Sequence, residues 1–180
     1  MRRAKMSLYD LVLAALLLGI GLILHAVFPG IFAGMKPDFS LIMLFVILML
    51  TADKRVGFIA GIATGIITAL TTTFPMGEIP NVIDKLVTTA AVLAMLRIVP
   101  KKVLVPVVGV VGTLVSGITF LTSAAVIAEL PASFTSLMGM VVLPAAAINT
   151  VGLFLLYPIA VKLYAINKAG SRITTAPTEK

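Results

Sequence analysis

The basic residues of this chain occur in groups, and enough apolar sequence for two membrane crossings separates each group from the next. Twelve of the fourteen Lys and Arg residues fall in four clusters, which are Arg2, Arg3 and Lys5; Lys54 and Arg55; Arg97, Lys101 and Lys102; and Lys162, Lys168, Arg172 and Lys180. Loops on the cytoplasmic side of a membrane retain Lys and Arg, so the pattern assigns a side to every loop. We therefore predict an all-α membrane bundle of six transmembrane helices with both termini in the cytoplasm.

The composition agrees with a membrane protein. The chain is 60% hydrophobic and only 12% charged, with a mean hydropathy of +1.16. A soluble domain of 180 residues could not bury that much apolar surface, so a lipid bilayer must cover part of it. The net charge of +7 lies at predicted helix ends and not along one stripe, which favours membrane orientation over nucleic-acid binding.

The hydropathy pattern gives approximate bounds for the six spans. They cover residues 8–28, 39–52, 56–73, 82–98, 103–128 and 138–164. The second is short for a crossing that needs ~20 residues, so either residues 30–35 dip into the membrane or this helix is packed inside the bundle. We expect Asp10, near the cytoplasmic edge, to be solvated. Residues 1–166 form the predicted membrane domain, and 167–180 form a polar, disordered cytoplasmic tail.

Two of the predicted spans carry small residues four positions apart. Gly57, Gly61 and Gly65 line one face of the third span, where another helix backbone can approach closely. Packing within the bundle is the favoured interpretation, and a docking face for a partner is the alternative. Ala15 and Gly19 form a shorter version on the first span, and there the two interpretations are nearly balanced.

The first predicted outer loop contains a candidate binding pair, Lys36 and Asp38. Pro37 between them fixes its own backbone and restricts the preceding residue, so both side chains sit in a stiff loop. Asp38 fits an N-cap of the second span as well as it fits a ligand contact. Lys36 opposes the positive-inside pattern, which makes it the stronger candidate.

The loop between the third and fourth spans supplies four more candidates, Glu78, Asn81, Asp84 and Lys85. Asn81 is a predicted N-cap, and Asp84 and Lys85 would then fall in the first helical turn. Asp suits the positive end of the helix dipole and Lys does not. Either the two form a surface pair of little energetic value, or they lie at membrane depth and require a partner or a ligand.

The last span contains Pro144 and Asn149. A Pro inside a transmembrane helix frees a backbone carbonyl, which a nearby Asn can satisfy. Repair of the helix is therefore one interpretation of Asn149. A buried carboxamide facing a cavity also suits a carboxylate or an ammonium group, and we favour this second interpretation.

Together these residues place charges and amides near the outer mouth of an apolar bundle, a combination that suits a zwitterion with an apolar body. The chain has no Cys and one His, and it lacks the Gly-rich phosphate loop and the motifs of hydrolytic enzymes. We therefore predict a binding protein with no catalytic residue, no metal site and no cofactor of its own.

Three stretches resemble the signature sequences of the tryptophan transporter family TrpP. They are GMKPD at 34–38, ALTTTFPMGEIPNVIDK at 69–85 and LPAAAINT at 143–150. The resemblance covers nearly the whole chain and implies a substrate-binding S component of an energy-coupling factor (ECF) transporter in the bacterial plasma membrane. Such proteins capture a nutrient from outside and dock on a transmembrane coupling subunit, while two ATPase subunits use the ATP.

The family resemblance also implies L-tryptophan as the substrate and docking through small residues on the first helix. Many S components use Ala-x-x-x-Ala there, and this chain has Ala15 and Gly19 at that spacing. The predicted substrate contacts are Lys36, Asp38, Glu78, Asn81, Lys85 and Asn149, with Asp84 as a further candidate. The alternatives are an S component for another aromatic nutrient or vitamin, a structural subunit of a membrane complex, and a solitary secondary transporter.

Overall fold

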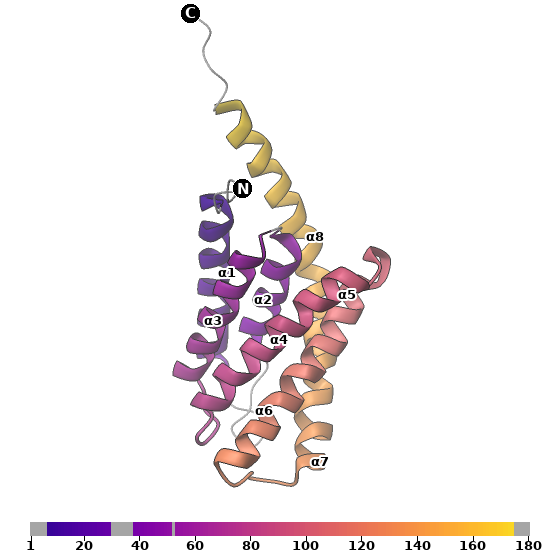
Figure 1. Ribbon diagram of the computed structural model, residues 1–180. Helices are drawn as coiled ribbons and strands as arrows, with labels where there is room; N and C mark the ends of the chain where they lie inside the picture. The colour runs from indigo at the N-terminus through magenta and orange to yellow at the C-terminus, as the bar shows by residue number, and fades with distance from the viewer. Residues whose placement is uncertain (1–6, 30–37, 52, 175–180) are drawn as a thin grey trace, which may run out of the picture.

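The computed structural model describes residues 7–29, 38–51 and 53–174, and this part of the chain is helical and contains no strand (Figure 1). It forms six successive helical segments. Four are α1 (Leu8–Val27), α2 (Phe39–Leu50), α3 (Lys54–Leu70) and α4 (Glu78–Ile98). The fifth joins a 3₁₀ turn (Lys101–Val103), α5 (Leu104–Val107), a π-helical turn (Val108–Gly112) and α6 (Thr113–Ile127). The sixth joins α7 (Phe134–Leu137), a second π-helical turn (Met138–Val142) and α8 (Leu143–Thr174).

Four of these segments are long and apolar enough to cross a membrane. They are Leu8–Val27, Glu78–Ile98, Lys101–Ile127 and Phe134–Asn167. The predicted all-α membrane bundle is thus confirmed. The start of α1 and the end of α8 lie at the same end of the bundle (Figure 1), and the predicted cytoplasmic location of this end stays a prediction.

Helix α2 lies inside the bundle. Its 12 residues span ~18 Å, well short of a hydrocarbon core of ~30 Å. Every residue from Ser40 to Leu48 is buried, and α2 packs against α1, α3, α4 and α8. A helix that is apolar all round belongs in a protein interior. This confirms the second of the two interpretations of the short span, and residues 30–35 of the other interpretation lie outside the described residues.

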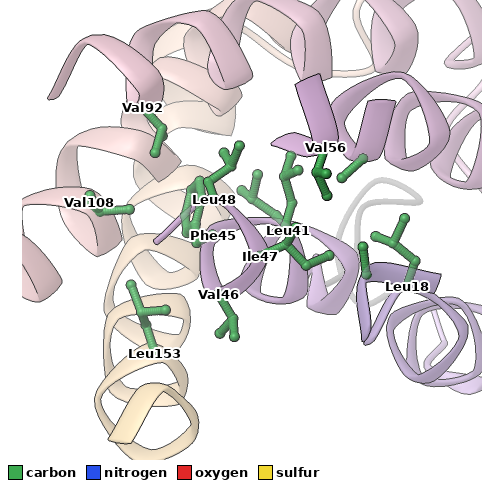
Figure 2. Close-up of a cluster of buried hydrophobic side chains, with 13 residues drawn as sticks. Leu18, Leu41, Phe45, Val46, Ile47, Leu48, Val56, Val92, Val108 and Leu153 are labelled. Carbon is green, nitrogen blue, oxygen red and sulfur yellow. The ribbon is translucent and has the colours of Figure 1, made fainter. Parts of the chain in front are cut away.

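The apolar core is built around α2 (Figure 2). Leu41, Phe45 and Leu48 of α2 lie among side chains from the surrounding segments, which include Leu18, Val56, Val92, Val108 and Leu153. Gly57, Gly61 and Gly65 allow α3 to approach closely, because a Cβ at these positions would meet Leu48, Thr89 and Val82. Packing within the bundle is therefore confirmed for this small-residue face.

The fourth helix begins earlier than predicted. It starts at Glu78, its N-cap is Gly77, and the side-chain Nδ2 of Asn81 donates to the carbonyl of Gly77 at 2.8 Å. The predicted N-cap role of Asn81 is wrong. Pro80 is tolerated in the first turn of a helix, so the helix can begin before Asn81. Asp84 and Lys85 consequently lie in the second turn, where they are buried.

The last helix extends farther than predicted. It continues to Thr174, so helix occupies much of the 167–180 range expected to be a disordered tail. Its Tyr164 hydroxyl donates to Asp10 Oδ1 at 2.8 Å, and Asp10 is buried. The expectation that Asp10 is solvated is therefore wrong, because the side chain of Tyr164 on α8 reaches the start of α1 and bonds the carboxylate.

Candidate functional site

A pocket lies between α2, α4, α6 and α8, in the half of the bundle nearest the loop that joins α3 to α4. Its lining combines buried charges, hydroxyls, amides and aromatic rings. The residues are His25, Asp38, Leu41, Thr72, Thr73, Phe74, Asn81, Asp84, Lys85, Thr113, Ser116, Gly117, Phe120, Val141, Val142, Ala145 and Asn149. Apolar bodies with a few converging polar groups are typical of small-molecule sites.

A buried ion cluster occupies one side of the pocket. Lys85 Nζ lies 2.6 Å from Asp38 Oδ2 and also contacts Asp84 Oδ2. Lys85 and Asp84 are each 1% exposed, so the predicted alternative of a solvated surface pair is wrong. Two carboxylates share one ammonium group, which leaves one negative charge in excess when His25, 3.7 Å from Asp38, is neutral.

Both carboxylates are held in place by further hydrogen bonds. Asp84 accepts from Thr88 Oγ1 at 2.8 Å and from Ser116 Oγ at 2.9 Å. Asp38 is the N-cap of α2 and accepts from the backbone N–H of Leu41 at 3.0 Å. The predicted cap is thus confirmed, and the same carboxylate also pairs with Lys85. These bonds fix the geometry of the charges before any ligand arrives.

Asn149 lies on the α8 side of the pocket and is fully buried. Its Nδ2 donates to Thr113 Oγ1 at 3.2 Å, whereas its Oδ1 has no hydrogen-bond partner in the described part of the chain. The side chain bonds α6 and not a carbonyl of its own helix. A π-helical turn ends at Val142, two residues before Pro144, and changes the local hydrogen bonding. The geometry therefore gives no support to helix repair as the role of Asn149.

Aromatic and aliphatic side chains line the rest of the pocket. The rings of Phe74 and Phe120 meet edge to face with their centroids 5.2 Å apart. Leu41, Val142 and Ala145 add apolar surface. Offset and edge-to-face arrangements are those that aromatic rings prefer, so a third ring can extend this cluster.

The pocket brings together five of the seven predicted substrate contacts, namely Asp38, Asn81, Asp84, Lys85 and Asn149. Glu78 is exposed and is not among the lining residues. Lys36 lies outside the described residues. Substrate contact by each of the seven stays a prediction. No group of three or more His, Asp or Glu side chains is placed to hold a metal ion in the described ranges.

Sequence reasoning missed the contribution of α6. Thr113, Ser116 and Phe120 all line the pocket, together with Gly117. Their spacing of three, four and seven positions puts them on one face of a helix. The helix also carries Thr119, Thr122 and Ser123, which do not line the pocket, so the spacing of Thr113 and Ser116 was a weak signal for this wall.

The predicted docking residues lie elsewhere, on α1. Ala15 is exposed, and a Cβ added at Gly19 would meet no atom within 4 Å. Large apolar side chains flank them and are also exposed, including Leu16, Ile20 and Ile23. This face of α1 is therefore open in the described bundle, unlike the glycine face of α3.

Comparison with known proteins gives a consistent result. The family model described as "Tryptophan transporter TrpP" matches residues 7–164. A Bacillus subtilis protein named "Probable tryptophan transport protein" is 44% identical over 157 residues, covering 86% of this chain and 91% of the relative. Proteins of the same name from Clostridium acetobutylicum and Clostridium perfringens are 43% and 42% identical, and each match covers 82% of this chain and 88% of the relative. No solved structure matches.

Proposed function

The chain belongs to the TrpP tryptophan transporter family, and from this premise we propose that it captures L-tryptophan as the S component of an ECF transporter. The family and the apolar spans make it a multi-pass bacterial membrane transport protein and not an enzyme. The observation that carries the proposal is the buried pocket, in which an ion cluster, an amide and two aromatic rings converge. These are the groups that a zwitterion with an aromatic side chain requires.

The charges of the cluster suit both ends of the amino acid. Two carboxylates outnumber the single ammonium, so the α-ammonium of the substrate would balance the excess negative charge beside Asp38 and Asp84. Lys85 has three N–H donors, and its two ion pairs use two of them. The third donor is available for the substrate carboxylate. Charge-assisted bonds of this kind are among the stronger hydrogen bonds in proteins.

The apolar wall suits the side chain. Phe74 and Phe120 offer ring edges and faces, and Val142 of the second π-helical turn and Ala145 of α8 add aliphatic surface. An indole ring lying against these residues in the pocket would bury a large apolar area and extend the aromatic pair. The pocket thus provides separate surfaces for the charged and the aromatic parts of tryptophan.

Energy coupling would come from partner subunits. We propose that the exposed Ala15 and Gly19 face of α1 docks on the transmembrane coupling subunit, because small residues let two helix backbones approach closely within lipid. The sequence contains no Gly-rich phosphate loop, so ATP hydrolysis is assigned to the two ATPase subunits.

Calorimetry with the purified protein in detergent tests substrate capture. We expect saturable binding of L-tryptophan and weaker binding of phenylalanine. Indole-3-propionate, which lacks the ammonium group, should bind more weakly than tryptamine, which lacks the carboxylate, because the cluster carries excess negative charge. A monodisperse sample that does not bind tryptophan would contradict the proposal and favour another nutrient or a structural role.

Uptake into proteoliposomes tests the coupling role separately. Protein reconstituted with the coupling and ATPase subunits should accumulate tryptophan only when ATP is supplied. Ala15→Leu and Gly19→Leu should bind tryptophan normally and fail in uptake, because the added side chains hold the partner helix away. Uptake by this chain alone would instead indicate a secondary transporter, and normal uptake by both variants would exclude this docking face.

A further inference from the structure

We propose that the carboxamide oxygen of Asn149 accepts the hydrogen bond of the indole N–H, and that this residue selects tryptophan over aromatic amino acids without that donor. The inference rests on the proposed function and assigns one specificity determinant within the same pocket. It concerns an acceptor that is already buried and oriented in the protein. The ion cluster, by contrast, would recognise any α-amino acid.

The side-chain oxygen of Asn149 is an acceptor that the described part of the chain leaves unsatisfied. Asn149 is 0% exposed, and Oδ1 has no hydrogen-bond partner among the described residues, although the residue lines the pocket. A buried polar atom without a partner is costly, and the great majority of such atoms in proteins are satisfied. Ser40 Oγ is also buried without a partner, but Ser40 does not line the pocket. His25 does line the pocket, and its Nδ1 faces the carboxylate of Asp38 at 3.7 Å. Asn149 Oδ1 is therefore the acceptor among the described lining residues that remains for a ligand to satisfy.

The amide of Asn149 is oriented by its bond to α6. Nδ2 donates to Thr113 Oγ1 at 3.2 Å, which leaves the oxygen as the end of the amide that remains to be bonded. An oxygen in this position requires a donor from the ligand. Zwitterionic tryptophan has two donor groups, the α-ammonium and the indole N–H. The carboxylates of Asp38 and Asp84 attract the ammonium, which leaves the indole N–H for Asn149.

Helix α6 links the Asn149 acceptor to the ion cluster. Thr113, which bonds Asn149, and Ser116, which bonds Asp84, lie about one turn apart on the same face of α6. One turn corresponds to ~5 Å along the helix. The indole acceptor is thus placed about one helical turn deeper than the carboxylate that would bind the ammonium, on the side away from the loop joining α3 to α4.

Apolar residues of the last segment line the pocket beside Asn149. Val142, Ala145 and Asn149 follow one another at spacings of three and four along one face of the last segment. Opposite them, α6 comes close at Gly117, where a Cβ would overlap Val142. A flat ring lying along this apolar wall would direct its polar edge toward Asn149.

The test compares two ligands of nearly the same shape on two proteins. In 3-(3-benzothienyl)alanine, sulfur replaces the indole N–H of tryptophan. We expect the wild-type protein to bind tryptophan about 10- to 100-fold more tightly than this analogue, since the analogue leaves the acceptor unpaired. Asn149→Leu should weaken tryptophan binding by a similar factor and leave the affinity for the analogue nearly unchanged, so that the preference disappears.

Asn81→Leu is the matched control, because it removes another carboxamide that lines the same pocket. It should change the affinities of both ligands by the same factor and keep the preference. Thr113→Val is the second variant should Asn149→Leu fail to give a monodisperse protein. It retains Asn149 but removes the hydroxyl that orients the amide, and it should reduce the preference in part.

Three results would overturn the inference. Equal wild-type affinities for tryptophan and the analogue would show that no acceptor meets the indole N–H. A preference unchanged in both Asn149→Leu and Thr113→Val would place the acceptor at another residue. No wild-type binding of either ligand would overturn the proposed function as well, and this distinguishes the failure of the function from the failure of the inference alone.

Discussion

Helix α2 joins two halves of the bundle whose interiors differ in kind. From Leu44 to Leu48 its surroundings are apolar, and packing alone explains the burial (Figure 2). At its other end, Asp38 and Leu41 border a pocket in which charges and hydroxyls are buried beside aromatic rings. The comparison shows that close packing stabilises the buried side chains in one half, whereas hydrogen bonds and ion pairs stabilise the buried polar side chains in the other.

The difference extends to how polar side chains are satisfied. On α3, which packs near the core, Thr64 and Thr68 donate to carbonyls of their own helix, so their hydroxyls need no other partner. At the ion cluster, by contrast, Thr88 and Ser116 donate to the side-chain carboxylate of Asp84. A hydroxyl that bonds a carbonyl of its own helix does not restrict how that helix packs on its neighbours. A hydroxyl that bonds a charged side chain on another helix fixes the position of the two helices relative to each other. The helices around the pocket are therefore held in one arrangement by side-chain bonds, and we expect single substitutions to disturb this half more than the apolar half.

The largest effect is expected for Lys85→Met. The substitution retains an apolar stem but leaves Asp38 and Asp84 buried without their cation, which costs about 3–5 kcal/mol when one partner of a buried pair is removed. Tryptophan binding should be lost as well. Thermal unfolding in detergent measures the first effect, and calorimetry measures the second.

The double variant Lys85→Met with Asp84→Asn serves as the control for charge. It removes one cation and one anion together, so it should recover part of the stability lost in Lys85→Met without restoring binding. Equal stability of Lys85→Met and wild type would show that the two carboxylates find other partners. That outcome would remove the distinction between the two halves.

A core substitution should affect stability and leave binding unchanged. Leu44 is 0% exposed within the apolar cluster, and Leu44→Ala should destabilise the bundle by about 2–5 kcal/mol through lost packing and a cavity. Tryptophan affinity measured well below the unfolding temperature should stay within twofold of wild type. A large loss of affinity with an intact fold would show that the core half also shapes the pocket.

The two small-residue faces allow a third comparison. At Gly61 an added Cβ would collide with Thr89, so Gly61→Val should destabilise by about 1–3 kcal/mol through overpacking. At Gly19 nothing lies within 4 Å, so Gly19→Val should leave unfolding unchanged. The pair is matched in chemistry and differs only in surroundings. Equal unfolding temperatures of the two variants would contradict the packing of α3 on α4.

The sequence was sufficient for the helices and for much of the pocket. Hydropathy and the basic clusters predicted six segments near their observed positions. Lys85 was singled out because it opposes both the positive-inside pattern and the helix dipole, and it is buried in an ion cluster. The physical reason is that a charge within a membrane protein is costly, so the sequence carries one only where a partner exists.

The remaining pocket residues could not be predicted, because their position depends on how each helix is rotated about its own axis. In lipid both faces of a helix can be apolar, so hydropathy does not reveal which face looks inward. Thr113 and Ser116 were therefore missed, although their spacing marks one face of α6. The partners of Asp10 and Asp84 lie 154 and 32 residues away along the chain, on α8 and α6, and no local pattern encodes such distances.

The smallest expected effect concerns a charge outside both halves and outside the membrane spans, at the start of α3. Asp53 caps this helix, and hydrogen bonds from Arg55 lower the pKa of its carboxyl below the ordinary value. A lowered pKa in the folded state means that the ionised carboxylate stabilises the fold above the unfolded-state pKa, and that this contribution is lost as pH falls through the lower folded value. Because the pair is solvent-accessible, the contribution is small.

Asp53→Asn keeps a capping oxygen and removes the charge, so it isolates this contribution. The difference in unfolding temperature between wild type and Asp53→Asn should be slight and constant from pH 8 to pH 5, and it should vanish only below about pH 4, where the carboxyl becomes protonated. Tryptophan affinity should not change, because Asp53 lies at the opposite end of α3 from the pocket. A difference that already disappeared between pH 7 and pH 6 would mean that the carboxyl titrates above its ordinary value, and the ion pair with Arg55 would then not stabilise its charged form.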